Sequence, residues 1–198
     1  MNKKFTISED CLNKAKQFAI NSVGTSTDKY ARRNQNNVER IIDQIKEGKV
    51  AEEIAYTFLS QKFNNIKKPD YEIYEKGQKS WDSDLKDLDS KLKFAVKGQE
   101  SKSAFLYGKS WVFQKNANSS LYDVDKEIFS NKKDPNNFVC FVYLNIPKRV
   151  ALVESIVKVD WLHEKNLFKP MQVQQLQSNK LAVYHDDLLE FQEEIFQI

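Results

Sequence analysis

The sequence contains few of the residues that build zinc sites or histidine-rich metal centres. Its 198 residues include only two cysteines and two histidines. Cys11 and Cys140 lie far apart and form no CxxC or Cys/His spacing, which argues against zinc, and a chain of this length needs no disulfide. His163 and His185 have no partner pattern for catalysis and are expected to be structural or at the surface. Any metal is therefore expected to be held by carboxylates, which favours Mg²⁺ or Mn²⁺.

Long apolar runs are also missing from the sequence. No stretch approaches the ~20 apolar residues of a membrane-spanning helix. The basic start MNKKFTISED is not followed by an apolar segment, so no signal peptide is predicted. These features favour a cytoplasmic, globular protein with no membrane partner. The net charge of +3 is mildly basic, which permits nucleic-acid binding without requiring it.

The pattern of apolar residues changes from helical to strand-like along the chain. Helical spacing covers 8–23, 27–48 and 49–63, with a break expected at Gly24 and a cap or kink at Gly48. Strand patterns follow in YEIYEK, LKFAVK, SWVFQ and FVCFVYLNI, and the last of these is expected to be a central strand covered on both faces. A short strand and a helix from near Asp186 complete the pattern.

This order predicts an α/β (α+β) sheet sandwich. The chain is expected to form a single domain over 1–198. Residues 1–47 would be a helical N-terminal segment, and residues 48–198 would form the core and the C-terminal elements.

Acidic residues and a lysine surround the strand predicted in KLKFAVKGQE. Side chains alternate along a strand, so Ala95 and Lys97 are expected on one face. Asp84 lies shortly upstream, where it could sit beside Lys97. Glu52 shares a helix face with buried positions such as Ala55, where a carboxylate is costly unless it is paired or bound to metal. Carboxylate-bound Mg²⁺ beside a lysine suits phosphodiester hydrolysis.

The motifs GKVAEEIAYTFL, DSDL and FAVKGQ resemble those of the PD-(D/E)XK nuclease superfamily, which includes restriction enzymes, Holliday-junction resolvases and repair nucleases. The resemblance covers about residues 48–115. It implies a restriction-endonuclease-like fold with a mixed central β-sheet flanked by helices, Mg²⁺-dependent (or Mn²⁺-dependent) cleavage of double-stranded DNA, and a homodimer. It assigns Asp84 and Glu52 to the metal, and Lys97 to the scissile phosphate or the attacking water.

One position departs from the pattern of that superfamily. The acid expected two residues before the lysine is Ala95 in this chain. Either Gln99 or Glu100 replaces it, with Gln99 preferred, or the site binds one metal, or it is inactive. Asp70, in the literal Pro-Asp pair, is the alternative to Asp84; we prefer Asp84 because Asp70 precedes the first predicted strand.

Arg, Lys, Asn and Gln side chains elsewhere are candidates for contacts to phosphates and base edges. They are Arg32, Arg33 and Asn34 in YARRNQNN, and Lys109 and Gln114 around SWVFQ. The same residues also suit a polar helix face or the ends of a core strand, and Asp84 and Lys97 suit a solvated surface hairpin. The favoured hypothesis is a type II restriction endonuclease. The alternatives are a resolvase or repair nuclease of the same fold, or a catalytically inactive DNA-binding or interaction module.

Overall fold

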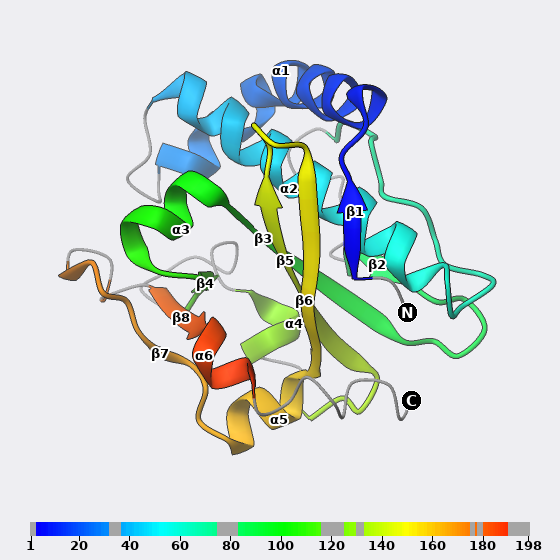
Figure 1. Cartoon of the computed structure of the whole chain (residues 1–198), viewed down its shortest axis with the longest axis vertical. Helices are drawn as coiled ribbons and strands as arrows, with labels where there is room; N and C mark the ends of the chain where they lie inside the picture. The colour runs from blue at the N-terminus through cyan, green and yellow to red at the C-terminus, as the bar shows by residue number, and fades with distance from the viewer. Residues whose placement is uncertain are drawn as a thin grey trace.

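A five-stranded mixed sheet lies at the centre of the computed structural model, which describes residues 3–31, 37–74, 83–115, 125–129, 133–174, 177 and 180–189. In spatial order the strands are β1 (Lys4–Thr6), β6 (Val150–Lys158), β5 (Asn137–Asn145), β3 (Lys93–Glu100) and β2 (Leu85–Lys86). β3 and β5 run parallel, and the other neighbouring pairs of this sheet run antiparallel (Figure 1). The predicted mixed sheet flanked by helices is therefore confirmed.

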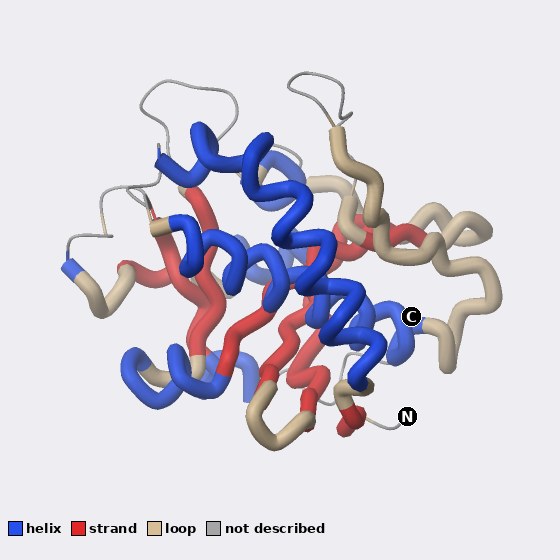
Figure 2. The backbone as a smooth tube through the Cα atoms, turned by 90° about the horizontal axis from the view of Figure 1, so that it is seen from above, coloured by secondary structure: helices blue, strands red, loops and turns tan. Residues whose placement is uncertain are grey.

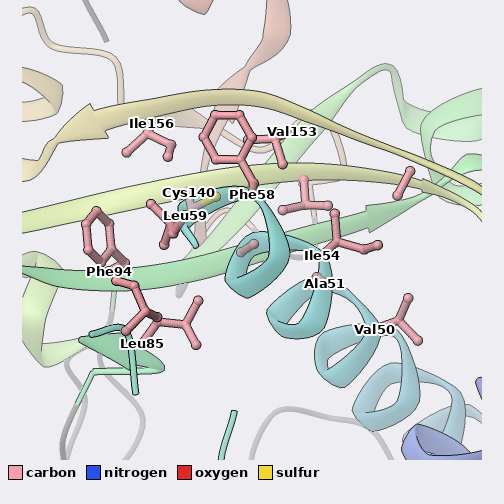
Figure 3. Packing of buried hydrophobic residues seen from close by; sticks show 14 of the residues in the cluster. Val50, Ala51, Ile54, Phe58, Leu59, Leu85, Phe94, Cys140, Val153 and Ile156 are labelled. Carbon is pink, nitrogen blue, oxygen red and sulfur yellow. The ribbon is translucent and has the colours of Figure 1, made fainter. Parts of the chain in front are cut away.

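Two long helices cover one face of this sheet. α1 (Glu9–Ala31) and α2 (Val38–Leu59) pack against each other, and α2 contacts β3, β5 and β6 (Figure 2). Figure 3 shows apolar side chains of α2, among them Ile54 and Phe58, beside Cys140 and Val153 of the sheet. Within the described residues, neither these nor any other helix combines the length and apolar character needed to cross a membrane.

The other face of the central sheet is covered by a second, smaller sheet. It has the order β4 (Ser110–Gln114), β8 (Lys180–Tyr184), β7 (Lys169–Pro170), and both of its strand pairs are antiparallel. Trp111 and Phe113 of β4 pack against Val139 and Phe141 of β5 in a second apolar cluster. β5 is therefore covered on both faces, as its continuous apolar sequence predicted.

Four short helices connect or follow these strands. α3 (Ser101–Tyr107) follows β3 directly, and α4 (Lys126–Phe129) precedes β5. α5 (Val159–Glu164) and α6 (His185–Leu188) each begin where a strand ends. Ile128, Leu162 and Leu188 from α4, α5 and α6 complete the second apolar cluster. The predicted strand and helix near Asp186 correspond to β8 and α6.

The break predicted at Gly24 and the cap predicted at Gly48 are both wrong, because α1 continues through Gly24 and α2 continues through Gly48. A glycine inside a helix costs only about 1 kcal/mol relative to alanine, and burial of the neighbouring residues offsets this. Val50 and Ala51, just after Gly48, are fully buried. α2 begins at Val38, where the Asn37 side chain accepts the backbone N–H of Arg40.

Two strand predictions also need correction. β3 does not end at Lys97 but continues to Glu100, because its parallel pairing with β5 extends as far as Glu100 opposite Leu144. Lys97 therefore lies inside the strand. The described residues of YEIYEK, 71–74, form no strand.

Gly98 of β3 allows α2 to lie close to the sheet. A Cβ atom at this position would lie 2.8 Å from the Cβ of Ala51 and 3.8 Å from a methyl carbon of Leu144. The Ala51 methyl group is fixed to the helix backbone and cannot rotate away. The glycine therefore sets the distance between α2 and the half of β3 that follows Lys97.

Candidate active site on strand β3

Asp84 lies beside the strand that carries Lys97. Leu85 pairs with Phe94, so Asp84 is one residue beyond the paired register and opposite Ala95. Its Oδ2 atom accepts the backbone N–H of Val96 at 2.8 Å. The structure thus brings Asp84 to β3, next to the position at which the sequence lacks an acid.

Lys97 projects toward the smaller sheet and forms an ion pair with Asp125. Its Nζ atom lies 2.8 Å from Asp125 Oδ1 and 4.9 Å from the centre of the Phe113 ring. The two charged side chains are 21% and 24% exposed, so the pair is only partly shielded from water. Lys97 is therefore a partly buried cation between a carboxylate and an aromatic ring.

Asp125 is a site residue that the sequence analysis missed. Its Oδ2 atom accepts the backbone N–H of Gln114 at 2.8 Å, and its own N–H donates to the Gln114 carbonyl oxygen at 3.1 Å. Its carbonyl oxygen accepts the N–H groups of Ile128 and Phe129 at the start of α4. These bonds to β4 and α4 place the Asp125 carboxylate over Lys97. The only sequence signal is an aspartate just before a short helical pattern in a polar stretch.

Glu52 lies on the opposite side of the central sheet from Lys97. Its carboxylate pairs with Lys49 at 2.6 Å, and both side chains are mostly buried. The Lys49 ammonium lies 5.0 Å from the Phe18 ring centre and 5.5 Å from that of Tyr71, so this pair is next to α1. The structure does not bring Glu52 to Asp84 and Lys97. The buried Glu52 carboxylate is instead compensated by its ion pair with Lys49.

Gln99 and Glu100, the candidates for replacing the missing acid, both bond to the chain around α3. The Gln99 amide donates to the Gly108 carbonyl oxygen at 3.0 Å and accepts the Ser110 N–H at 2.8 Å. The Glu100 carboxylate accepts the Lys102 N–H at 2.6 Å and so caps α3. Both side chains therefore support the connection between β3 and β4.

The remaining candidates are dispersed. Lys109 pairs with Glu154 at 2.5 Å, and Gln114 ends β4 next to Asp125. Asp70 accepts the Glu72 N–H and the Tyr74 hydroxyl, each at 2.8 Å, which gives it a local role in its loop. Three further candidates, Arg32, Arg33 and Asn34, lie outside the described residues.

Both cysteines are free, as expected, and both histidines contact the protein interior. His163 Nε2 lies 2.7 Å from the Ile128 carbonyl oxygen, and His185 Nδ1 lies 3.6 Å from the Glu154 carboxylate. Neither histidine contacts Asp84 or Lys97 in these interactions.

A half-buried carboxyl group lies near the C-terminal end of β3. Burial, and then the charge of the Glu100 carboxylate, raise the pKa of Glu47 from 4.5 to about 7. Glu47 belongs to α2, which Gly98 allows to approach the sheet closely. The protein therefore holds a carboxyl group that exchanges its proton near neutral pH.

Replacing Glu47 by glutamine is expected to stabilise the protein above pH 7. Between the unfolded pKa of 4.5 and the folded pKa of about 7, the native protein binds a proton that the unfolded chain has released. Stability therefore falls as pH rises through this range, by about 1–3 kcal/mol in total. Urea unfolding at pH 5 and pH 8 should show a smaller fall in Glu47→Gln than in wild type. The exposed Glu39→Gln variant should keep the wild-type fall; equal falls in all three proteins would contradict this prediction.

The carboxylates next to β3 can be compared with the needs of a divalent ion. In the described part of the chain, no group of three or more His, Cys, Asp and Glu side chains could hold a metal. Mg²⁺, however, often binds through one or two carboxylates and completes its shell with water and substrate phosphate. Asp84 contacts β3 at the Val96 N–H and Asp125 contacts it at the Lys97 ammonium, so two carboxylates lie beside successive residues of this strand. Comparisons of the chain with protein-family models, curated proteins and solved structures give no match.

Proposed function

We propose that the protein is a metal-dependent endonuclease of the PD-(D/E)XK type that cleaves double-stranded DNA, as type II restriction endonucleases do. One observation carries this proposal: two carboxylates contact consecutive residues of one strand, and the second of these residues is a lysine. Asp84 accepts the N–H of Val96, and Asp125 pairs with the ammonium of Lys97. The central sheet with helices on one face is compatible with a restriction-endonuclease-like fold.

In this proposal, Asp125 supplies the acid that Ala95 lacks. Ala95 and Lys97 face the smaller sheet, and Asp125 reaches the same face from the segment between β4 and α4. Asp84 and Asp125 would hold Mg²⁺ or Mn²⁺. Gln99 then keeps its place in the α3–β4 turn, and Glu52 keeps its pairing with Lys49.

The side chains around this position suit hydrolysis of a phosphodiester. A divalent ion, when bound, would polarise the phosphate and activate a water molecule. The Lys97 ammonium can turn from Asp125 to a phosphate oxygen and stabilise the charge that develops there. The Phe113 ring beneath the ammonium limits where that cation can lie. Lys109 and Gln114, at the two ends of β4, are the described candidates for contacts to the DNA backbone.

Cleavage of both DNA strands requires two such sites, so the proposal includes a homodimer that acts on DNA in the cytoplasm. A resolvase or repair nuclease would use the same three residues on branched or damaged DNA.

A catalytically inactive DNA-binding module is the second candidate, and the Lys97–Asp125 pair favours it. A phosphate would have to compete with an ion pair already formed at 2.8 Å. Such a protein would bind DNA but leave it intact.

Incubating the protein with supercoiled plasmid and Mg²⁺ or Mn²⁺ tests these alternatives. Discrete fragments are the expected result and would support a restriction endonuclease. Cutting confined to four-way junctions or damaged duplexes would support the resolvase or repair nuclease instead. Intact plasmid in both metals, together with a mobility shift of the same DNA in Ca²⁺, would refute the nuclease proposal and favour the inactive module.

A further inference from the structure

His163 joins α5 to α4 through a hydrogen bond to the backbone (Figure 1). Its Nε2 atom lies 2.7 Å from the Ile128 carbonyl oxygen. A carbonyl oxygen can only accept, so Nε2 carries the hydrogen and donates it. The imidazole ring also contacts two phenyl rings, with its centre 5.8 Å from that of Phe129 and 4.8 Å from that of Phe168. These three contacts hold the His163 ring against α4.

α4 depends on bonds from other elements to keep its place. It is a single turn, Lys126–Phe129, and a helix this short leaves its last carbonyl groups without partners inside the helix. The Ile128 side chain is fully buried in the second apolar cluster, where an unpaired carbonyl group would be costly. The donor on His163 satisfies the Ile128 carbonyl group and so secures this turn.

The turn that His163 secures is bonded to Asp125. The Asp125 carbonyl oxygen accepts the Ile128 N–H at 3.0 Å. The Asp125 carboxylate lies 2.8 Å from the Lys97 ammonium, and its other oxygen accepts the Gln114 N–H at 2.8 Å. A continuous chain of hydrogen bonds and backbone therefore runs from the His163 ring through α4 to the carboxylate that faces Lys97.

We propose that His163 is a positioning residue for the Asp125 carboxylate, and that it acts through the hydrogen bond from Nε2 to the Ile128 carbonyl oxygen. This inference rests on the proposed function, since Asp125 is the acid that this function assigns to the metal. It adds a side chain of α5 to a site built from β3 and from the segments next to β2 and β4. His163 acts on that site only through α4.

Two substitutions separate the hydrogen bond from the ring contacts. His163→Phe keeps an aromatic ring and removes the donor, whereas His163→Gln keeps an amide N–H near the position of Nε2. The first readout is amide hydrogen exchange at Gln114 in the full chain, because this N–H bonds directly to the Asp125 carboxylate. Exchange should be about 10-fold faster in His163→Phe than in wild type, since a buried acceptor is left unpaired. His163→Gln should exchange as wild type does.

The second readout is steady-state cleavage of plasmid DNA in Mg²⁺. His163→Phe should lower kcat by about 10–100-fold and leave KM within about twofold, because a misplaced carboxylate impairs the reaction more than the binding of DNA. Ile54→Ala serves as the control, since Ile54 is buried in α2 on the other face of the central sheet. It should lower stability but keep wild-type exchange at Gln114 and wild-type kcat.

The outcomes separate this inference from the proposed function. If wild type cleaves DNA but His163→Phe keeps wild-type exchange at Gln114 or wild-type kcat, the role of His163 is wrong and the nuclease stands. Equal losses in His163→Gln or in Ile54→Ala would also overturn the inference, because the donor would then not matter. If wild type cleaves no DNA, the proposed function falls, and exchange at Gln114 still decides whether His163 holds Asp125 in place.

Discussion

Replacing Lys97 by alanine is expected to lower the rate of DNA cleavage by about 100-fold or more, because the variant loses the cation that stabilises charge on the phosphate. Binding of DNA in Ca²⁺ should weaken far less, since one lysine is a small part of the contact to a duplex. Conversion of supercoiled plasmid to nicked and linear forms measures the first effect, and a mobility shift measures the second.

A matched control for this variant lies in the same strand. Lys93 also forms a partly exposed ion pair, with Asp134 at 3.3 Å, but lies four residues away from Lys97. Lys93→Ala should cleave within about twofold of wild type, because losing such a pair changes stability by only ~0–1 kcal/mol. Cleavage by Lys97→Ala at the wild-type rate would show that the lysine assignment is wrong.

The Asp125→Asn variant distinguishes two possible roles of Asp125, as a metal ligand and as the partner that positions Lys97. If Asp125 holds the metal, Asp125→Asn should lose cleavage as Asp84→Asn does, and higher Mn²⁺ should partly restore it. If Asp125 only holds Lys97 in place, the variant should free the ammonium and keep or raise activity. The second result would leave the acid missing at Ala95 without a replacement.

Replacing Phe94 by alanine is expected to lower the free energy of unfolding by about 3–5 kcal/mol. Phe94 is fully buried in β3, and its ring centre lies 5.9 Å from that of Phe63 and 5.6 Å from that of Phe138. The lost stability is the sum of two terms: the transfer free energy of the buried phenyl group and the cost of the cavity that it leaves. For a protein of this size, the melting temperature should fall by roughly 6–20 °C.

Two variants set the scale for this effect. Phe94→Leu keeps most of the volume and should cost less than about 2 kcal/mol, whereas Phe105→Ala at the exposed surface should change stability by at most ~0.5 kcal/mol. Urea unfolding of all three proteins measures these differences. A change below about 1 kcal/mol in Phe94→Ala would mean that the packing around β3 is not the one described. Because Phe94 pairs with Leu85, this variant should also loosen Asp84.

The sequence predicted the strands better than the positions of the charged residues. Alternation around Ala95 and Lys97 and the unbroken apolar run of β5 are local patterns, and they correctly predicted a strand covered on both faces beside the strand that carries Lys97. Helical spacing likewise showed that Glu52 lies among buried residues. It could not show which face of the sheet α2 covers, because that depends on how β3, β5 and β6 pair.

Asp125 shows most clearly why the positions of the charged residues could not be predicted from the sequence. Its place is set by two hydrogen bonds to the backbone of Gln114, one from its own N–H and one to its carboxylate, and by the packing of α4 against the smaller sheet. Neither leaves a periodic signal. The break expected at Gly24 and the helix end expected at Gly48 failed for a related reason. The low helix propensity of glycine favoured them, and packing of the flanking residues overrode that preference.

The pairing of β1 with β6 determines when the sheet can be completed during synthesis of the chain. Phe5 is opposite Ala151, so β1 leaves the ribosome long before its partner strand β6 is made. At about 5–20 residues per second, that delay is roughly 7–30 s. α1 and α2 can form in the meantime, since their contacts are local, but the apolar face of α2 must wait for β3, β5 and β6. The apolar face of α2 therefore stays uncovered in the nascent chain until these strands follow, and this is the interval in which a chaperone would act on it.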